Sequence, residues 1–151
     1  MRLITAVCLL LAASAASAGA SPLPPALAAY EGKLIYLDFW ASWCGPCGQS
    51  FPWLNQMQEK YGANLVIVGV GVDEDTKAGD GFLKKHPARF EIVRDPDGKL
   101  PELYGIEGMP SAVLIAPDGK VLHKHSGFRS QQIAEYEAAI RAALPREEAS
   151  K

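Results

Sequence analysis

The pair Cys44 and Cys47, separated by only two residues, constrains the fold of this 151-residue sequence more than any other feature. The run that precedes the pair, residues 34–40, is apolar and rich in β-branched and aromatic residues, which is typical of a buried strand. Large apolar residues then recur at helical spacing before a capping glycine: Phe51, Leu54, Met57, Tyr61 and Gly62. The sequence therefore predicts that Cys44 lies at a helix N-terminus, where unpaired N–H groups and the helix dipole favour a reactive thiolate.

Two other interpretations of the cysteine pair, a structural zinc site and a structural disulfide, have less support in the sequence than redox chemistry. A structural zinc site needs four ligands, but the only other cysteine is Cys8, and three histidines stand at no compact zinc spacing: His86, His123 and His125. A purely structural disulfide would close a very short loop and would add little stability through loop entropy. We therefore expect redox chemistry, with the reversible Cys44–Cys47 disulfide as the redox group and with no metal or other cofactor.

The N-terminus has the features of a secretory signal peptide over residues 1–18. Arg2 supplies a positive charge, residues 3–13 are apolar but too short to cross a bilayer, and residues 16–18 form a small-residue cleavage site. We expect cleavage before Gly19 and a soluble product in the periplasm or another extracytoplasmic compartment, with an uncleaved anchor as the alternative. No later stretch is long and apolar enough to span a membrane.

The composition fits one globular domain. The chain carries 15 basic and 17 acidic residues without a basic run, so a nucleic-acid partner is not expected. We assign residues 19–32 to a Pro- and Ala-rich lead-in, residues 33–145 to a single domain, and residues 146–151 to a frayed tail. We expect the protein to be a monomer.

Strand-like and helix-like segments alternate through the domain. After the first strand, the expected strands are 64–71, 90–93, 112–116 and 121–126, the last two being joined by a hairpin turn. After the cysteine helix, the expected helices are a short one around Phe82 that stops at Pro87, one over 99–104, and one from an N-cap at Ser130 to Leu144. This order predicts an α/β fold, with a mixed, mostly parallel central sheet and helices on both faces.

Three stretches give the chain a resemblance to a known family. They are residues 38–47 (DFWASWCGPC), residues 68–75 (VGVGVDED) and residues 95–119, which hold a Gly-Met-Pro loop followed by a hairpin. On these motifs the chain resembles the thioredoxin superfamily. Its middle is similar to the TlpA-like group of extracytoplasmic thiol–disulfide oxidoreductases, which includes proteins of cytochrome c maturation. The resemblance covers roughly residues 33–144 and implies a thioredoxin-like fold.

The resemblance implies a role for each matching residue. Cys44 matches the nucleophile that attacks a partner's disulfide, and Cys47 matches the resolving thiol that breaks the mixed disulfide. Pro110 matches the cis-proline that lies against the disulfide and offers a backbone edge to the substrate. Met109 before it would touch both the disulfide and the partner. The substrate would also contact the residues around the nucleophile: Trp43, Gly45 and Pro46.

Asp38 lies in the otherwise apolar strand before the motif and matches the buried acid of thioredoxins. Poor solvation raises the pKa of a carboxyl group. Asp38 would then take the proton from Cys47, through a water molecule, while the resolving thiol attacks. The alternative is an aspartate at a strand end that reaches solvent or a backbone N–H group.

Two positions beside the motif depart from the family pattern. Gly48 stands where related proteins commonly carry a basic residue, and Ser50 stands where many TlpA-like proteins carry a glutamate. The lead-in at 19–32 also leaves little room for the N-terminal hairpin of many relatives. These departures weaken a specific assignment to cytochrome c maturation.

The dipeptide Gly45-Pro46 between the cysteines is of the thioredoxin type, and thioredoxin is a strong reductant at about −270 mV. We therefore expect a reductase of protein disulfides, fed by a membrane electron donor that the resemblance implies. Its clients would be secreted proteins, an apocytochrome or a copper-site protein.

Three other functions stay open: a disulfide donor, a peptide-binding module that uses the Pro110 edge, and a Cu(I) carrier. The carrier would use the two cysteines with three further side chains: Met109, His123 and His125. The competing interpretation of the two histidines is a polar face on an edge strand.

Overall fold

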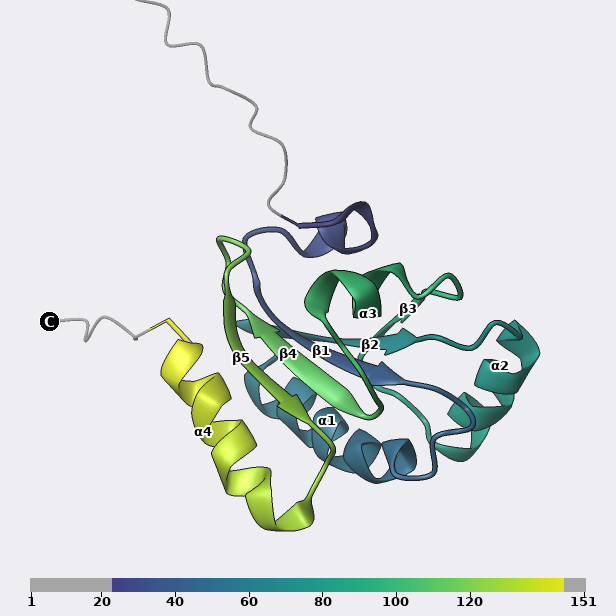
Figure 1. Ribbon diagram of the computed structural model, residues 1–151. Helices are drawn as coiled ribbons and strands as arrows, with labels where there is room; N and C mark the ends of the chain where they lie inside the picture. Colours follow the sequence, from purple (N-terminus) through teal and green to yellow (C-terminus); the bar gives the residue numbers. More distant parts are fainter. Residues whose placement is uncertain (1–22, 146–151) are drawn as a thin grey trace, which may run out of the picture.

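The computed structural model describes residues 23–145 of the chain (Figure 1). The expected signal peptide with its cleavage site, the start of the lead-in, and the expected tail at 146–151 lie outside the described residues. Within residues 23–145, no helix has both the length and the apolar character needed to cross a bilayer.

The described residues form one sheet of five strands in the order β3-β2-β1-β4-β5. The strands are β1 (Leu34–Trp40), β2 (Leu65–Gly71), β3 (Glu91–Arg94), β4 (Ser111–Ile115) and β5 (Val121–Ser126). Strand β1 pairs in parallel with β2, and β2 with β3, whereas β4 runs antiparallel to both β1 and β5. The mixed sheet expected from the sequence is confirmed, with β1 at its centre. The expectation that it is mostly parallel is wrong, because two of its four strand pairings are antiparallel.

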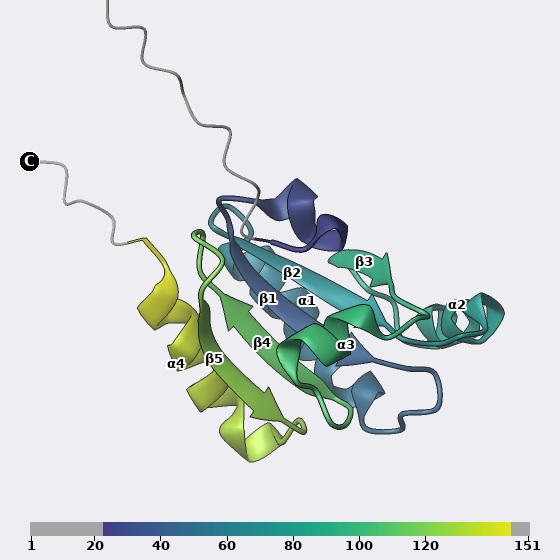
Figure 2. The ribbon, with the colours of Figure 1, turned by 45° about the horizontal axis from the view of Figure 1, so that its top comes forward.

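In the same part of the chain, helices cover both faces of the sheet. They are α1 (Cys47–Tyr61), α2 (Thr76–Lys85), α3 (Lys99–Tyr104) and α4 (Ile133–Ala143), with 3-10 turns at Pro25–Tyr30 and Ser130–Gln132. Helices α1 and α4 lie over one face, while α3 and the first 3-10 turn lie over the other, as Figure 1 and Figure 2 show. The predicted layer order is therefore confirmed.

Strand β1 is buried along its whole length, and its side chains point alternately into two cores. Leu37 and Phe39 belong to the core beneath α3 and the first 3-10 turn, whereas Tyr36 and Trp40 belong to the core beneath α1 and α4. Asp38 shares the face of Tyr36 and Trp40, because successive side chains of a strand alternate between its faces. Its carboxyl group therefore lies on the side of α1, the helix that follows the cysteines.

Helix α2 begins earlier than the sequence predicted, at Thr76. Asp75 caps the first turn, because its side chain accepts a hydrogen bond from the Lys77 N–H at 2.9 Å. Gly79 weakens an isolated helix, but it leaves room for the guanidinium group of Arg94, which would contact any Cβ at this position. A glycine that disfavours the helix locally thus gives the Arg94 side chain the space that it occupies.

Helix α4 begins later than predicted, at Ile133, and Ser130 does not cap it. The residues between them form a 3-10 turn. The hydroxyl group of Tyr136 accepts a hydrogen bond from the Arg129 N–H at 3.2 Å and donates one to the Gln132 side chain at 3.1 Å. A side chain within the helix therefore fixes its entry, in place of the expected N-cap serine.

Candidate active site

Cys44 and Cys47 are joined by a disulfide with an S–S distance of 2.09 Å. The sequence predicted Cys44 at a helix N-terminus. Helix α1 begins at Cys47, so Cys44 lies in the turn that leads into this N-terminus. The Cys44 N–H donates to the Ala41 carbonyl at 3.1 Å, and the Cys47 N–H donates to the Cys44 carbonyl at 3.2 Å. These two turns lead the chain from β1 into α1, and they place Cys44 about one helical turn before the first residue of α1.

The two cysteines have different surroundings. Cys44 is 5% exposed and stands beside Trp43, which is 72% exposed. Gly45 and Pro46 are exposed as well, whereas Cys47 is completely buried. A partner's sulfur atom can therefore approach Cys44, and the residues predicted to contact substrate surround that approach.

Asp73 anchors the loop before the cysteines, and it is a residue that the sequence analysis missed. It follows β2 and is only 6% exposed. Its carboxylate accepts hydrogen bonds from the Ser42 N–H at 2.9 and 3.1 Å and from the Ser42 hydroxyl group at 2.5 Å. Because β1 and β2 are parallel, their carboxyl ends meet at one edge of the sheet, so an acid directly after β2 was a detectable signal.

The Met109–Pro110 peptide bond is cis, as the resemblance implied. Pro110 is buried, and its carbonyl accepts the Gly127 N–H at 2.7 Å. Met109 packs against the core that contains both cysteines. Ser111 pairs with Phe39, near the end of β1 from which the cysteine loop leaves. The segment that the resemblance assigns to substrate contact thus lies at the same end of the sheet as the disulfide.

Asp38 is 3% exposed, and its Oδ2 atom is buried without a hydrogen-bond partner. Burial raises the pKa of the Asp38 carboxyl well above its usual value, and the nearby Ser50 hydroxyl opposes this rise in part. The alternative in which Asp38 reaches solvent from a strand end is therefore wrong. A carboxyl group in this environment accepts a proton more readily than an exposed aspartate does.

Ser50 lies between the buried acid and the buried cysteine. It is completely buried in α1, and its hydroxyl group donates to the Cys47 carbonyl at 3.0 Å. A hydroxyl group has a single proton, so it cannot donate to this carbonyl and to the Asp38 carboxylate at once. The sequence revealed Ser50 only as a departure from a glutamate, although its position one helical turn after Cys47 placed it on the same face of α1.

The basic side chain that is absent at position 48 has a counterpart in space. A Cβ on Gly48 would lie 2.5–2.8 Å from three ring atoms of His86, so the imidazole ring lies directly against this glycine. A cavity of about 310 Å³ beside it is lined by Cys44 together with Lys77, Lys85 and His86. In the sequence His86 stood out only as a candidate zinc ligand, and its distance from Gly48 along the chain gave no sign of this contact.

His125 has both ring nitrogens engaged within the protein. Its Nε2 lies 2.9 Å from the Tyr36 hydroxyl group, and its Nδ1 lies 3.0 Å from the Gly127 carbonyl. The ring stacks on Tyr136 with a centroid separation of 4.1 Å, and burial lowers the pKa of His125. Both histidines lie on β5, which is an edge strand as the competing interpretation expected. His123 is exposed, whereas His125 is half-buried and engaged by its neighbours. Within residues 23–145, no group of three or more His, Cys, Asp or Glu side chains is arranged to hold a metal ion.

The sequence matches the family described as Redoxin over residues 12–140. This chain belongs to the Redoxin family. Among its relatives, the thiol-disulfide oxidoreductase ResA from Bacillus thuringiensis subsp. konkukian is 33% identical over 109 residues. That match covers 71% of this Redoxin chain and 63% of the ResA chain, so less than two thirds of the relative's length is spanned.

Solved structures resemble this Redoxin chain in fold. A candidate thiol:disulfide interchange protein DsbE from Chlorobium tepidum is 50% identical, with a TM-score of 0.76 over 79% of this chain and 85% of that one. The exposed lipoprotein thioredoxin of Streptococcus pneumoniae is 29% identical, with a TM-score of 0.66 over 76% of this chain and 89% of that one. The thioredoxin-like fold and the TlpA-like resemblance predicted from the motifs are thereby confirmed.

Proposed function

We propose that this chain is an extracytoplasmic thiol–disulfide oxidoreductase that reduces the disulfides of client proteins. The observation that carries the proposal is the pairing of a reachable cysteine, Cys44, with a completely buried one, Cys47, on the face of β1 that also holds Asp38. The reaction class agrees with the names of the relatives, ResA and DsbE.

In the proposed reaction, the reduced pair delivers two electrons to a client disulfide. The Cys44 thiolate attacks one client sulfur, the client S–S bond breaks, and the second client sulfur leaves as a thiolate that takes up a proton. The Cys47 thiolate then attacks the Cys44 sulfur, and the mixed disulfide breaks. The client is released as a dithiol, and the Cys44–Cys47 disulfide forms.

Asp38 supplies the proton acceptor for the second attack. Cys47 has to lose its thiol proton, and its burial keeps bulk water from taking that proton directly. The buried carboxylate of Asp38 accepts it readily because burial raises its pKa. Once Asp38 is protonated, it can donate to the Ser50 oxygen, which leaves the Ser50 proton free for the Cys47 carbonyl. Ser50 thus accommodates both protonation states of the acid.

The pair must be reduced again after each turnover, so the proposal requires an electron donor, which we place in the membrane. The features of a signal peptide at residues 1–18 support an extracytoplasmic location, with the periplasm as the compartment for the mature monomer. Cytochrome c maturation is one setting in which such a reductase acts on an apocytochrome's cysteines.

The copper alternative gains no support from the site. His125, one of its expected ligands, is engaged by Tyr36 and Gly127 through both ring nitrogens. A Cu(I) ion would have to break these contacts before His125 could bind it.

The reduction potential of the Cys44–Cys47 pair tests the proposed direction of electron flow. The purified mature chain is equilibrated in thiol–disulfide redox buffers and alkylated, and the oxidised fraction is then measured by mass spectrometry. We expect about −250 mV or lower, near the thioredoxin end of the range. A value near −120 mV, typical of a strong oxidant, would make the chain a disulfide donor and would overturn the reductase proposal.

A further inference from the structure

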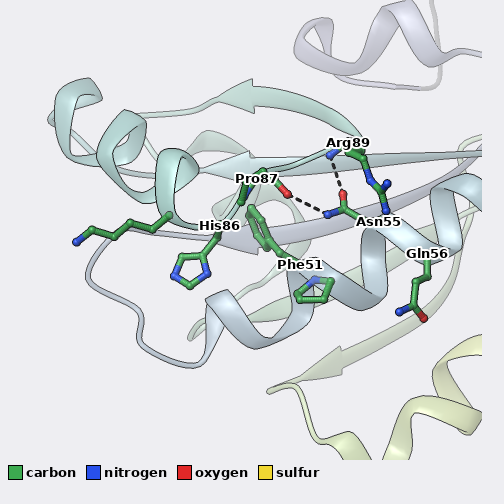
Figure 3. Close-up of a pocket in the computed structure, with 8 residues that line it drawn as sticks. Phe51, Asn55, Gln56, His86, Pro87 and Arg89 are labelled. Atoms are coloured by element: carbon green, nitrogen blue, oxygen red, sulfur yellow. Dashed lines mark hydrogen bonds between the residues drawn. The ribbon is translucent and has the colours of Figure 1, made fainter.

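Two neighbouring hollows extend from Cys44 along the boundary between α1 and α2. The first is the 310 Å³ cavity that Cys44 lines. The second has a volume of about 400 Å³ and appears in Figure 3. Its walls include these residues: Phe51, Asn55, Lys85, His86, Pro87 and Arg89. Lys85 and His86 line both hollows, so together they form one surface depression, here called the α1–α2 groove, which begins at the reactive cysteine.

The middle of this groove is fixed by packing around His86. The imidazole ring lies against Gly48, where any larger residue would displace it. On another side it contacts the Phe82 ring, with a centroid separation of 4.6 Å. The position of the His86 ring, which lines both hollows, therefore depends on residue 48 having no side chain.

The far rim of the groove is held by Asn55 of α1. Its Nδ2 donates to the Pro87 carbonyl at 2.9 Å, and its Oδ1 accepts the Arg89 N–H at 2.6 Å, as the dashed lines in Figure 3 show. One amide side chain thus uses both its donor and its acceptor to fix the segment that carries Arg89. The two hydrogen bonds of Asn55 therefore hold the rim in a defined position.

Positive charge dominates this groove. Within residues 23–145, Lys77 and Lys85 have no ion-pair partner. Arg89 lies 3.6 Å from Glu59, but both side chains are more than two-thirds exposed, so solvent screens this pair. The chain as a whole carries a net charge of −2. A basic groove on an acidic protein, starting at the nucleophile, selects for negative charge in whatever lies along it.

A third hollow, next to the one that Cys44 lines, has the opposite charge. It shares Ser42 and Ala78 with that hollow. Its other walls include Trp43 and three acidic residues that follow β2: Asp73, Glu74 and Asp75. A client segment near the disulfide therefore meets basic side chains toward α1 and α2, and acidic ones beyond Trp43. The sign of the charge on a client would decide which way its chain runs from the mixed disulfide.

We propose that the α1–α2 groove binds an extended client segment that carries Asp or Glu side chains beside its reactive cysteine. This proposal rests on the proposed function, because it names the clients that the same cysteine reduces. Lys85 and Arg89 pair with the client carboxylates, and Lys77 attracts the part nearest Cys44. The groove raises client affinity and orients the client, while the exchange chemistry stays with the two cysteines.

The test compares two disulfide-containing peptides that are identical except that Glu or Lys residues flank one cysteine. The reduced full chain should reduce the acidic peptide with a kcat/KM about two- to fivefold higher per engaged carboxylate. Raising the ionic strength should remove the preference, because exposed pairs are screened by salt. Lys85→Glu should abolish or reverse it.

Lys84→Glu is the matched control, because Lys84 neighbours Lys85 on α2, is exposed, and lines neither hollow. This variant changes the net charge equally, and we expect it to keep the preference for the acidic peptide. Equal kcat/KM values for both peptides in the wild type, or an equal loss in the two variants, would overturn the groove proposal.

A binding measurement separates failure of the groove from failure of the proposed function. The same peptides, with cysteine replaced by serine, are titrated against the full chain in an isothermal titration calorimeter. Tighter binding of the acidic peptide supports the groove even if the chain reduces neither disulfide peptide, which would count against the reductase alone. Equal binding of both peptides would contradict the groove whatever the redox result.

Discussion

The two cysteines of one short motif differ in their access to the surface. Cys44 is 5% exposed, lines one hollow and stands beside the exposed Trp43. Cys47 is completely buried, close to the Ser50 hydroxyl group and on the side of β1 that holds Asp38. We propose that these identical side chains, three positions apart, take different tasks. In this proposal the outer region, around Cys44, decides which client binds, and the inner region, around Cys47, decides how fast the client is released.

Replacing either cysteine with serine should have the largest effect on disulfide reduction, and the two variants should differ in the step that they block. We expect Cys44→Ser to abolish disulfide reduction, because the buried Cys47 cannot meet a client sulfur. Cys47→Ser should still attack once and then remain linked to the client, because nothing resolves the mixed disulfide. Non-reducing electrophoresis with mass spectrometry of the adduct measures both results. Equal capture by the two variants would show that burial does not divide their roles.

Replacing the buried acid should change how stability depends on pH. Because burial raises the pKa of Asp38 in the folded chain, the folded state holds this proton more tightly than the unfolded state. Protonated Asp38 therefore contributes to the free energy of unfolding. This contribution is complete below the pKa of the group in the unfolded chain, about 3.9, and it is lost as the pH rises through its pKa in the folded chain.

Asp38→Asn does not titrate at this position, so its stability relative to the wild type should increase over that same pH window. Denaturant unfolding of the oxidised proteins at a series of pH values measures the difference. A difference that stays constant from acid to neutral pH would mean that the Asp38 carboxyl is not perturbed by burial.

Removing the exposed ring of Trp43 should have the smallest effect on the fold. We expect Trp43→Ala to change the free energy of unfolding by no more than about 0.5 kcal/mol, because the side chain is 72% exposed. Its kcat/KM for a peptide client should fall by up to about tenfold, since the client loses an aromatic contact. Resolution of a preformed mixed disulfide should keep its rate. A slower resolution step would place Trp43 in the inner region as well.

The sequence predicted the fold well where burial is continuous. The first strand was predicted to the residue, 34–40, because it is buried on both faces and therefore apolar almost throughout. The start of α2 was missed because Gly79 resembles a helix breaker. The side chain that occupies the space beside this glycine is the guanidinium group of Arg94, which lies in β3. Local patterns specify local structure, and they do not reveal which distant side chain needs the space.

The candidate site shows the same limit. The cysteine pair, Pro110 and Asp38 were found from motifs, because their spacing within the chain is characteristic. The contacts of His86 with Gly48, of Asp73 with Ser42 and of His125 with Tyr36 join segments far apart in the sequence. Of these, only the acid after β2 left a signal in the sequence, because the ends of two parallel strands meet at one edge of the sheet. No spacing rule predicts the other two pairs from a single sequence, so the groove became visible only in the folded chain.

Single-turnover kinetics of Asp38→Asn test most directly whether the inner region controls release. Reduced wild type, Asp38→Asn and the exposed control Asp118→Asn are mixed with a disulfide peptide in a stopped-flow instrument, and attack and resolution are followed separately. We predict that attack keeps its rate in all three proteins, and that resolution slows about 10²-fold in Asp38→Asn alone. Equal resolution rates in wild type and Asp38→Asn would remove the acid from the mechanism and contradict the account.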